Sequence, residues 1–174
     1  MTPVTTTARL AFYPMSARDA DGLFRMNADP EVMRYTGEAP FASVQAAEGF
    51  LRAYDPYRQH GFGRWSLYLR DSGQYIGFCG LKRQPETGEV DVGYRLLRQH
   101  WGQGLATEAA RHSLAMGFET FGLSTIVGRA MPDNRASLRV LQKIGLVHSH
   151  YFQDNGVRWQ QLCIQAGDFR RQFT

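Results

Sequence analysis

Apolar and polar residues alternate along several short stretches of the chain, and this alternation predicts β-strands. The clearest case covers residues 89–97, where apolar side chains recur at every second position from Val90 to Tyr94. Similar strand-like runs occupy residues 9–15, 64–70, 75–82 and 125–130, and both sides of the turn formed by residues 154–156. Together these runs predict seven strands.

A spacing of three to four residues between apolar positions predicts helices between the strands. The longest helix begins after Gly104, where small and apolar side chains form one stripe: Ala106, Ala109, Ala110, Ser113, Leu114, Gly117, Phe118 and Phe121. Shorter helices are predicted to start at residues that suit a helix N-terminus, namely Ser16 with Asp19, Asp29-Pro30, Ser43, and Asn134 or Asp133. Gly145 suits the C-terminal end of the last of these helices.

The order of these elements predicts an α+β (mixed α/β) fold. Three consecutive strands from residue 64 to residue 97 imply antiparallel hairpins. The unit of strand, helix and strand from residue 89 to residue 130 implies one parallel crossover. We therefore expect a mostly antiparallel seven-stranded sheet with one parallel pair and helices on both faces. No repeat or linker divides the sequence, so residues 1–174 are predicted to form a single domain.

Composition narrows the class of protein. Hydrophobic residues make up 43% of the chain and charged residues 21%, which is typical of a globular protein. The net charge is +4, but no run of Lys or Arg supports a nucleic-acid surface. No apolar signal core or membrane-spanning stretch is present, so we expect a cytoplasmic protein that does not bind membranes. Cys79 and Cys163 lie in apolar runs and are predicted to be buried free thiols rather than a disulfide or metal site.

The segment from Trp101 to Ala106 contains the pattern Gly-x-Gly between a strand and a helix. The first N–H groups of a helix lack internal partners and carry partial positive charge, and glycine lets a phosphate approach them closely. This loop is therefore predicted to bind an anion, with Arg95 and Arg98 adding positive charge. The alternative is a tight turn that simply requires glycine. A dinucleotide site is disfavoured because Thr107 stands where the third glycine would be.

These segments resemble the GNAT acetyltransferase superfamily, and most closely its branch of ribosomal-protein N-terminal (alanine/serine) acetyltransferases. The stretch from Val92 to Ala109 is similar to the family's coenzyme A motif. The segment from Asn134 to Leu146, with Ser137 in its first turn, is similar to a second motif. The resemblance spans nearly the whole chain. It implies a GNAT-like fold in which the parallel strands splay apart, and a homodimer remains open by family analogy.

The resemblance also implies roles for individual residues. The backbone around Leu96 would hold the pantetheine arm and the acetyl carbonyl of acetyl-coenzyme A, Asn134 would bond the pantetheine, and Ser137 would lie near the sulfur. The pyrophosphate would be held by backbone N–H groups of one loop, namely Trp101, Gly102, Gln103, Gly104, Leu105, Ala106 and Thr107. Many members place a tyrosine general acid where this chain has Leu141, which shifts that role toward Ser137.

Chemistry narrows the catalytic candidates further. A neutral amine must attack the thioester, and an α-amine with a pKa of about 7.7–8.0 is roughly a tenth neutral at pH 7, whereas a lysine amine is less than about 0.1% neutral. A weak base is then sufficient, and Asp91 and Glu89 are the candidates, with a solvated strand face as the alternative. His100 is a further candidate base. Ser137 would donate a hydrogen bond to the departing thiolate, or its polarity belongs only to the helix cap.

The sequence therefore predicts an acetyl-coenzyme A-dependent N-acetyltransferase that uses no metal and transfers acetyl directly in a ternary complex. Its acceptor is predicted to be a protein or peptide N-terminal amine. The alternatives are acetylation of a small amine, a non-catalytic relative that binds acyl-coenzyme A, and RNA association through the basic balance. Four aromatic residues either line the acceptor pocket or pack in the core: Tyr35, Trp65, Tyr68 and Tyr94.

Overall fold

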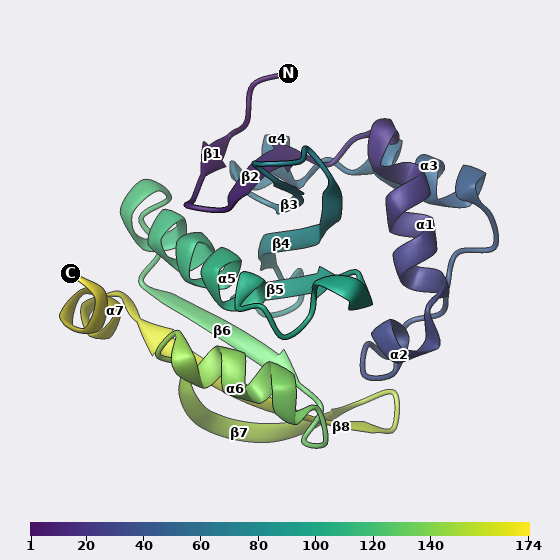
Figure 1. The fold of residues 1–174 in the computed structure, drawn as a ribbon. Helices are drawn as coiled ribbons and strands as arrows, with labels where there is room; N and C mark the ends of the chain where they lie inside the picture. The colour runs from purple at the N-terminus through teal and green to yellow at the C-terminus, as the bar shows by residue number, and fades with distance from the viewer.

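A computed structural model, which describes residues 1–174, contains one eight-stranded sheet (Figure 1). The strands are β1 (Thr5–Thr6), β2 (Leu10–Pro14), β3 (Arg64–Leu69), β4 (Tyr75–Arg83), β5 (Val90–Leu96), β6 (Thr125–Ala130), β7 (Val147–Asp154) and β8 (Val157–Gln165). Their order across the sheet is β1-β2-β3-β4-β5-β6-β8-β7. Only β5 and β6 pair in parallel, which confirms the predicted mixed topology. The short strand β1 raises the count from the predicted seven to eight.

Helices cover both faces of the sheet, as predicted. They are α1 (Ala20–Ala28), α2 (Pro30–Met33), α3 (Val44–Ala53), α4 (Pro56–His60), α5 (Leu105–Ala115), α6 (Arg135–Lys143) and α7 (Ala166–Phe173). A π-helical segment, Met116–Thr120, continues α5. None of these helices combines the length and the apolar character needed to cross a bilayer.

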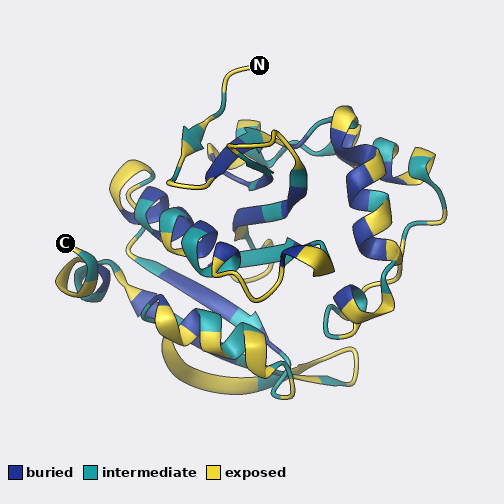
Figure 2. Cartoon of the chain, viewed as in Figure 1, coloured by how far each residue is buried: buried dark blue, intermediate teal, exposed yellow.

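Side chains of β4 from residue 78 to residue 81 alternate between two hydrophobic clusters on opposite faces of the sheet. Cys79 and Leu81 belong to the larger cluster of 25 buried residues, which packs under α5 and α6. Phe78, on the opposite face, packs against a smaller cluster formed by Met15 and by residues of α1, α2 and α3. Figure 2 shows the buried side of α5 turned toward the sheet, and β7 exposed along its length. Cys79 and Cys163 are both free thiols, as expected. Cys79 is buried as predicted, but Cys163 is only half-buried.

Helix caps fix where the chain turns from loop to helix. Ser43 Oγ accepts a hydrogen bond from Ala46 N at 3.1 Å, and Asp29 Oδ1 accepts one from Glu31 N at 3.0 Å. Asn134 Oδ1 accepts one from Ser137 N at 3.3 Å. Each of these caps was predicted, because short polar side chains satisfy the free N–H groups of a first turn.

The opening between β5 and β6 positions the candidate site. The two parallel strands share one bridge, between Asp91 and Val127, and they run apart toward their C-terminal ends (Figure 1). Leu97 N donates to Ile76 O of β4 at 2.9 Å. Because backbone groups alternate in direction along a strand, the backbone N–H and C=O groups of Tyr94 and Leu96 are directed toward the opening. An extended ligand can therefore lie along this edge of β5.

Candidate active site

One cavity of about 1230 Å³ connects the opening with both predicted segments. Its walls include most of the residues predicted from the sequence: Asp91, Leu96, Trp101, Gly102, Gly104, Leu105, Ala106, Thr107, Asn134 and Ser137. Glu89, Arg98 and Gln103 do not line it. The cavity continues to α1 and α3 on the other face of the sheet, where Asn27 and Phe50 line it. The loop and the first turn of α6 thus face one common space, although 30 residues separate Gly104 from Asn134.

The glycine loop is shaped to leave backbone N–H groups accessible. Gly102 and Gly104 have φ angles of 71° and 76°, which non-glycine residues rarely adopt. A side chain at Gly102 would meet no atom within 4 Å, and at Gly104 only Arg9 Nη2, at 3.5 Å. Gly104 is the N-cap of α5 and offers no side chain to satisfy the first turn. These amides therefore suit a diphosphate, whose oxygens can accept from several of them.

Glu108, in the first turn of α5, links this loop to the segment that precedes β2. Its carboxylate accepts hydrogen bonds from Thr7 Oγ1 at 2.6 Å, Arg9 N at 2.9 Å and Arg9 Nε at 2.7 Å. Arg9 Nη1 in turn donates to Gln103 O at 2.8 Å. Burial opposes ionisation of Glu108, but the bonds from Thr7 and Arg9 outweigh it and hold the pKa of this carboxyl below its usual value. The ion-pair partner of Glu108 is therefore Arg9, from the segment before β2, and not a residue of its own helix.

Replacing Glu108 with glutamine is expected to lower the free energy of unfolding by about 1–2 kcal/mol, because charge-assisted hydrogen bonds become neutral ones. Denaturant titration measures this change. Glu48→Gln is the matched control, because Glu48 forms an exposed pair with Arg52 and its loss should cost under about 0.5 kcal/mol. Equal stability of the two variants would contradict the linking role of Glu108.

Arg98 and His100 occupy the turn between β5 and the glycine loop. Arg98 Nε pairs with Asp29 Oδ2 at 3.0 Å, so its charge is directed to the junction of α1 and α2. His100 is 8% exposed and lines the cavity, and its Nε2 atom is buried without a hydrogen-bond partner. Burial lowers the pKa of His100 from its usual value, which keeps the imidazole neutral at pH 7.

The side chain of Trp101 contacts the C-terminal end of β5. Its indole Nε1 donates to Leu96 O at 3.0 Å, although the residue remains 45% exposed. The Leu96 carbonyl, which is directed toward the opening, therefore already accepts one hydrogen bond. A carbonyl oxygen has two lone pairs, so a second donor can still be accepted.

Asp91 lies in the cavity wall as one half of a buried ion pair. Arg64 Nη2 contacts Asp91 Oδ1 at 2.5 Å, and Gln84 Nε2 donates to Oδ2. Arg64 Nη1 also donates to Gly80 O at 2.8 Å and to Asp91 O at 3.0 Å. Burial raises the pKa of Asp91, but the charge and hydrogen bonds of Arg64 outweigh this effect and leave the pKa lowered. The Asp91 carboxylate is therefore ionised and fixed in place.

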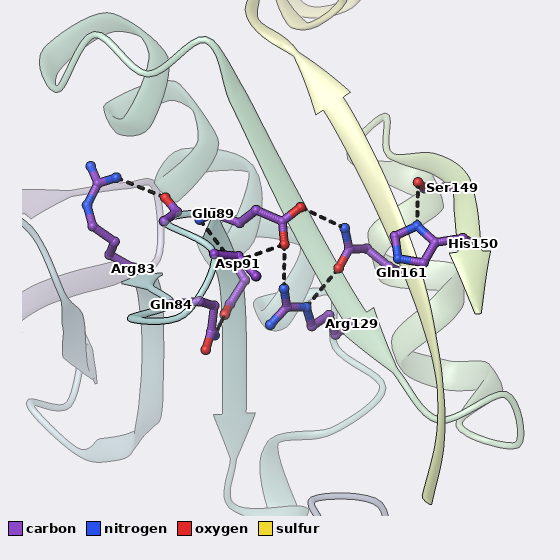
Figure 3. Close-up of polar contacts among 10 residues, drawn as sticks. Arg83, Gln84, Glu89, Asp91, Arg129, Ser149, His150 and Gln161 are labelled. Atoms are coloured by element: carbon purple, nitrogen blue, oxygen red, sulfur yellow. Dashed lines mark hydrogen bonds and ion pairs between the residues drawn. The ribbon is translucent and has the colours of Figure 1, made fainter. Parts of the chain in front are cut away.

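Glu89 contributes to a second polar group, beside the single β5–β6 bridge (Figure 3). Its Oε2 atom pairs with Arg129 Nη2 at 2.7 Å, and its Oε1 atom accepts from Gln161 Nε2 at 3.1 Å. Arg129 Nε donates to Gln161 Oε1 at 2.9 Å and closes the triangle. Since Arg129 lies on β6 and Gln161 on β8, these contacts tie the start of β5 to both strands. They hold β5 and β6 together at the end where the two strands are still paired.

Two hydroxyl groups meet at the start of α6. Tyr94, on β5, places its hydroxyl 2.9 Å from Ser137 Oγ and 3.0 Å from Ser137 O. Leu141, one turn further along α6, is 1% exposed and packs over Gly128. Of the four aromatic residues considered from the sequence, Tyr35 and Tyr94 line the cavity, whereas Trp65 and Tyr68 do not. The contact between Tyr94 and Ser137 was not predicted.

Comparison with known proteins gives a consistent result. A family model described as "Acetyltransferase (GNAT) domain" matches residues 9–147. An "Uncharacterized N-acetyltransferase p20" from Bacillus licheniformis is 32% identical over 151 residues, 83% of this chain and 85% of that one. An "FsC-acetyl coenzyme A-N(2)-transacetylase" from Aspergillus fumigatus is 29% identical over 160 residues, 86% of this chain and 67% of that one. A solved "acetyltransferase (GNAT family)" from Bacillus anthracis has the same fold, with a TM-score of 0.81 at 21% identity over 96% of this chain and 99% of that one.

Proposed function

This chain belongs to the GNAT acetyltransferase family, and from that premise we propose that it transfers acetyl from acetyl-coenzyme A to a protein or peptide N-terminal α-amine. The family relationship makes the protein an acyltransferase whose acceptor is an amine. One observation carries the proposal: the open glycine loop, the splayed strands and the Tyr94–Ser137 pair all face the same cavity.

In the proposed complex, the donor lies between β5 and β6. The backbone N–H groups of residues 101–107 hold its diphosphate, because Gly102 and Gly104 leave them accessible. Arg139 and Lys143 on α6 also line the cavity and add positive charge for the phosphates. Leu96 and Asn134 contribute backbone and side-chain hydrogen bonds to the pantetheine arm. The acceptor amine enters from the face of the sheet covered by α1 and α3.

The state of the carboxylates favours an acceptor with a low pKa. Asp91 and Glu89 are both paired with arginines, and the pKa of Asp91 is lowered, so neither is arranged as a strong base. An α-amine, roughly a tenth neutral at pH 7, can attack without one, whereas a lysine amine needs much more assistance. In the proposal, the proton released from the amine after attack passes through a water molecule beside Asp91 to solvent, and Glu89 keeps the strands in register.

Ser137 is the proposed hydrogen-bond donor to the departing sulfur. As the C–S bond breaks, its electron pair goes to sulfur and produces a thiolate whose parent thiol has a pKa of about 8.5. Such a leaving group needs a hydrogen bond rather than a strong acid. An acyl-cysteine route is disfavoured, because burial raises the pKa of Cys79 to about 11 and its Sγ atom contacts Ser113 Oγ at 3.4 Å.

The acceptor proposal can be tested by following release of free coenzyme A thiol over a panel of amines. We expect turnover with short peptides that have a free N-terminus, and loss of turnover when the same peptides are N-terminally blocked but retain a lysine. Turnover with small amines alone would favour the second candidate, a small-molecule acetyltransferase, for which the name of the Aspergillus fumigatus relative is an argument. Tight coenzyme A binding without any turnover would favour a non-catalytic acyl-coenzyme A-binding protein, consistent with Leu141 in place of the usual tyrosine.

Replacing Ser137 with alanine is expected to lower kcat by about 10- to 100-fold while the Kd for coenzyme A changes less than about twofold. The reason is that a hydrogen bond to a charged group contributes about 1.5–3 kcal/mol, and this one forms only as the thiolate develops. Steady-state kinetics and calorimetry measure the two quantities. Ser113→Ala is the matched control, since that buried hydroxyl bonds Ala109 O outside the cavity. Equal losses in kcat and affinity would make Ser137 a structural residue.

A further inference from the structure

The hydroxyl of Tyr94 has only one proton but two oxygen atoms of Ser137 within bonding distance. Ser137 O lies inside α6, where a carbonyl accepts from the N–H group four residues later. Ser137 Oγ has no such partner, and a serine in a helix otherwise turns its proton back toward its own backbone. The geometry thus allows two arrangements, in which the tyrosine proton lies either on the carbonyl or on the serine oxygen.

The two arrangements differ in where the serine proton points. If Tyr94 donates to Ser137 O, the Tyr94 oxygen is left as an acceptor, and a serine hydroxyl that donates to it is turned away from the cavity. If Tyr94 donates to Ser137 Oγ, the serine proton is free to face the cavity. Donation to an oxygen that itself donates also strengthens the second hydrogen bond, because the two bonds polarise each other.

We propose that Tyr94 is a positioning residue that donates to Ser137 Oγ and directs the serine proton at the sulfur of the donor. This inference rests on the proposed acetyl transfer and names how its leaving group is stabilised. The hydroxyl beside Ser137 thus comes from β5, whereas α6 has the apolar Leu141 one turn after Ser137. No proton is lost from the pair: Tyr94 donates to Ser137, Ser137 donates to the thiolate, and the thiolate is later protonated from solvent.

The surroundings of Tyr94 support a positioning role rather than that of an acid. Burial raises the pKa of its hydroxyl, and the hydrogen bond between Tyr94 and Ser137 opposes this only in part. The phenol therefore stays protonated at any working pH and remains a hydrogen-bond donor. Its ring lies on β5 opposite Cys79 of β4, and strand pairing fixes its direction more firmly than a loop would.

The test compares Tyr94→Phe, Ser137→Ala and the double variant. We expect Tyr94→Phe to lower kcat about tenfold with the KM for acetyl-coenzyme A nearly unchanged, and the double variant to be no slower than Ser137→Ala. Multiplicative losses in the double variant would overturn the proposal, as would an unchanged kcat in Tyr94→Phe. Tyr68→Phe is the matched control, because its hydroxyl donates to Asp19 and lies outside the cavity, so kcat should not change.

A second measurement needs no acceptor amine and stays informative if the acceptor proposal fails. The thiol of bound coenzyme A is titrated by the ultraviolet absorbance of its thiolate. We expect it to ionise at a pH lower by about one unit in the wild type than in Tyr94→Phe or Ser137→Ala, since one unit corresponds to about 1.4 kcal/mol of hydrogen bonding. Identical titrations in all three proteins would overturn the inference. A shift in the wild type with no turnover on any amine would refute only the catalytic function.

Discussion

Replacing Gly104 with valine is expected to weaken coenzyme A binding by at least about 100-fold. Gly104 has a φ of 76°, and a β-branched residue held there costs about 1–3 kcal/mol. Its side chain would also project at the start of α5, where Arg9 Nη2 lies 3.5 Å from the position of the new Cβ. Relief of this strain moves the loop, so the amides no longer point at one diphosphate. A tenfold change in affinity corresponds to about 1.4 kcal/mol. The loss of two hydrogen bonds between the loop amides and the diphosphate therefore accounts for the predicted weakening of about 100-fold.

Calorimetric titration with coenzyme A measures this loss, and Gly88→Val is the matched control. Gly88 has a φ of 71°, nothing lies within 4 Å of its added side chain, and it does not line the cavity. The control variant should therefore lose stability through the same strain while it retains the wild-type Kd. If Gly104→Val bound coenzyme A as well as Gly88→Val does, the glycine loop would not be the diphosphate site.

Features fixed by neighbouring residues were predictable from the sequence. The strand at residues 125–130 was predicted with the bounds that β6 has, and the glycine loop was found because its signal is contained in six residues. Short elements were missed because they contain too few residues for a period to be recognised. β1 has two residues and α4 has five. The helix predicted to continue to Phe121 changes at Met116 to π geometry, which an apolar stripe does not reveal.

The contacts that complete the site depend on tertiary structure. Arg9 and Glu108 are 99 residues apart in sequence, and Tyr94 and Ser137 are 43 apart. Arg64 reaches Asp91 because its guanidinium lies across Gly93, where any Cβ would collide with it. No local pattern contains this information, so the sequence identified Asp91 as polar and well placed but did not find the arginine that determines its charge state.

Replacing Asp91 with asparagine is expected to lower the free energy of unfolding by about 3–5 kcal/mol at pH 7. The Arg64 and Asp91 side chains are 15% and 9% exposed, so solvent screens the pair weakly and the variant leaves a buried cation without its partner. Denaturant titration measures the loss. Asp168→Asn is the matched control, because its pair with Arg171 is exposed and should contribute under about 1 kcal/mol.

The pH dependence of this difference tests its electrostatic origin. The folded-state pKa of Asp91 is lowered, so its stabilisation is fully present above the unfolded value of about 3.9 and is lost as the pH falls through the folded value. The gap in stability between the wild type and Asp91→Asn should therefore be constant from pH 7 to about pH 5 and narrow below about pH 4. A gap that stays the same at pH 3 would mean that packing rather than charge holds Arg64.

The same variant also tests the proposed water molecule beside Asp91. If the pH–rate profile of Asp91→Asn matched that of the wild type, Asp91 would have no part in proton transfer and would serve only as the structural partner of Arg64.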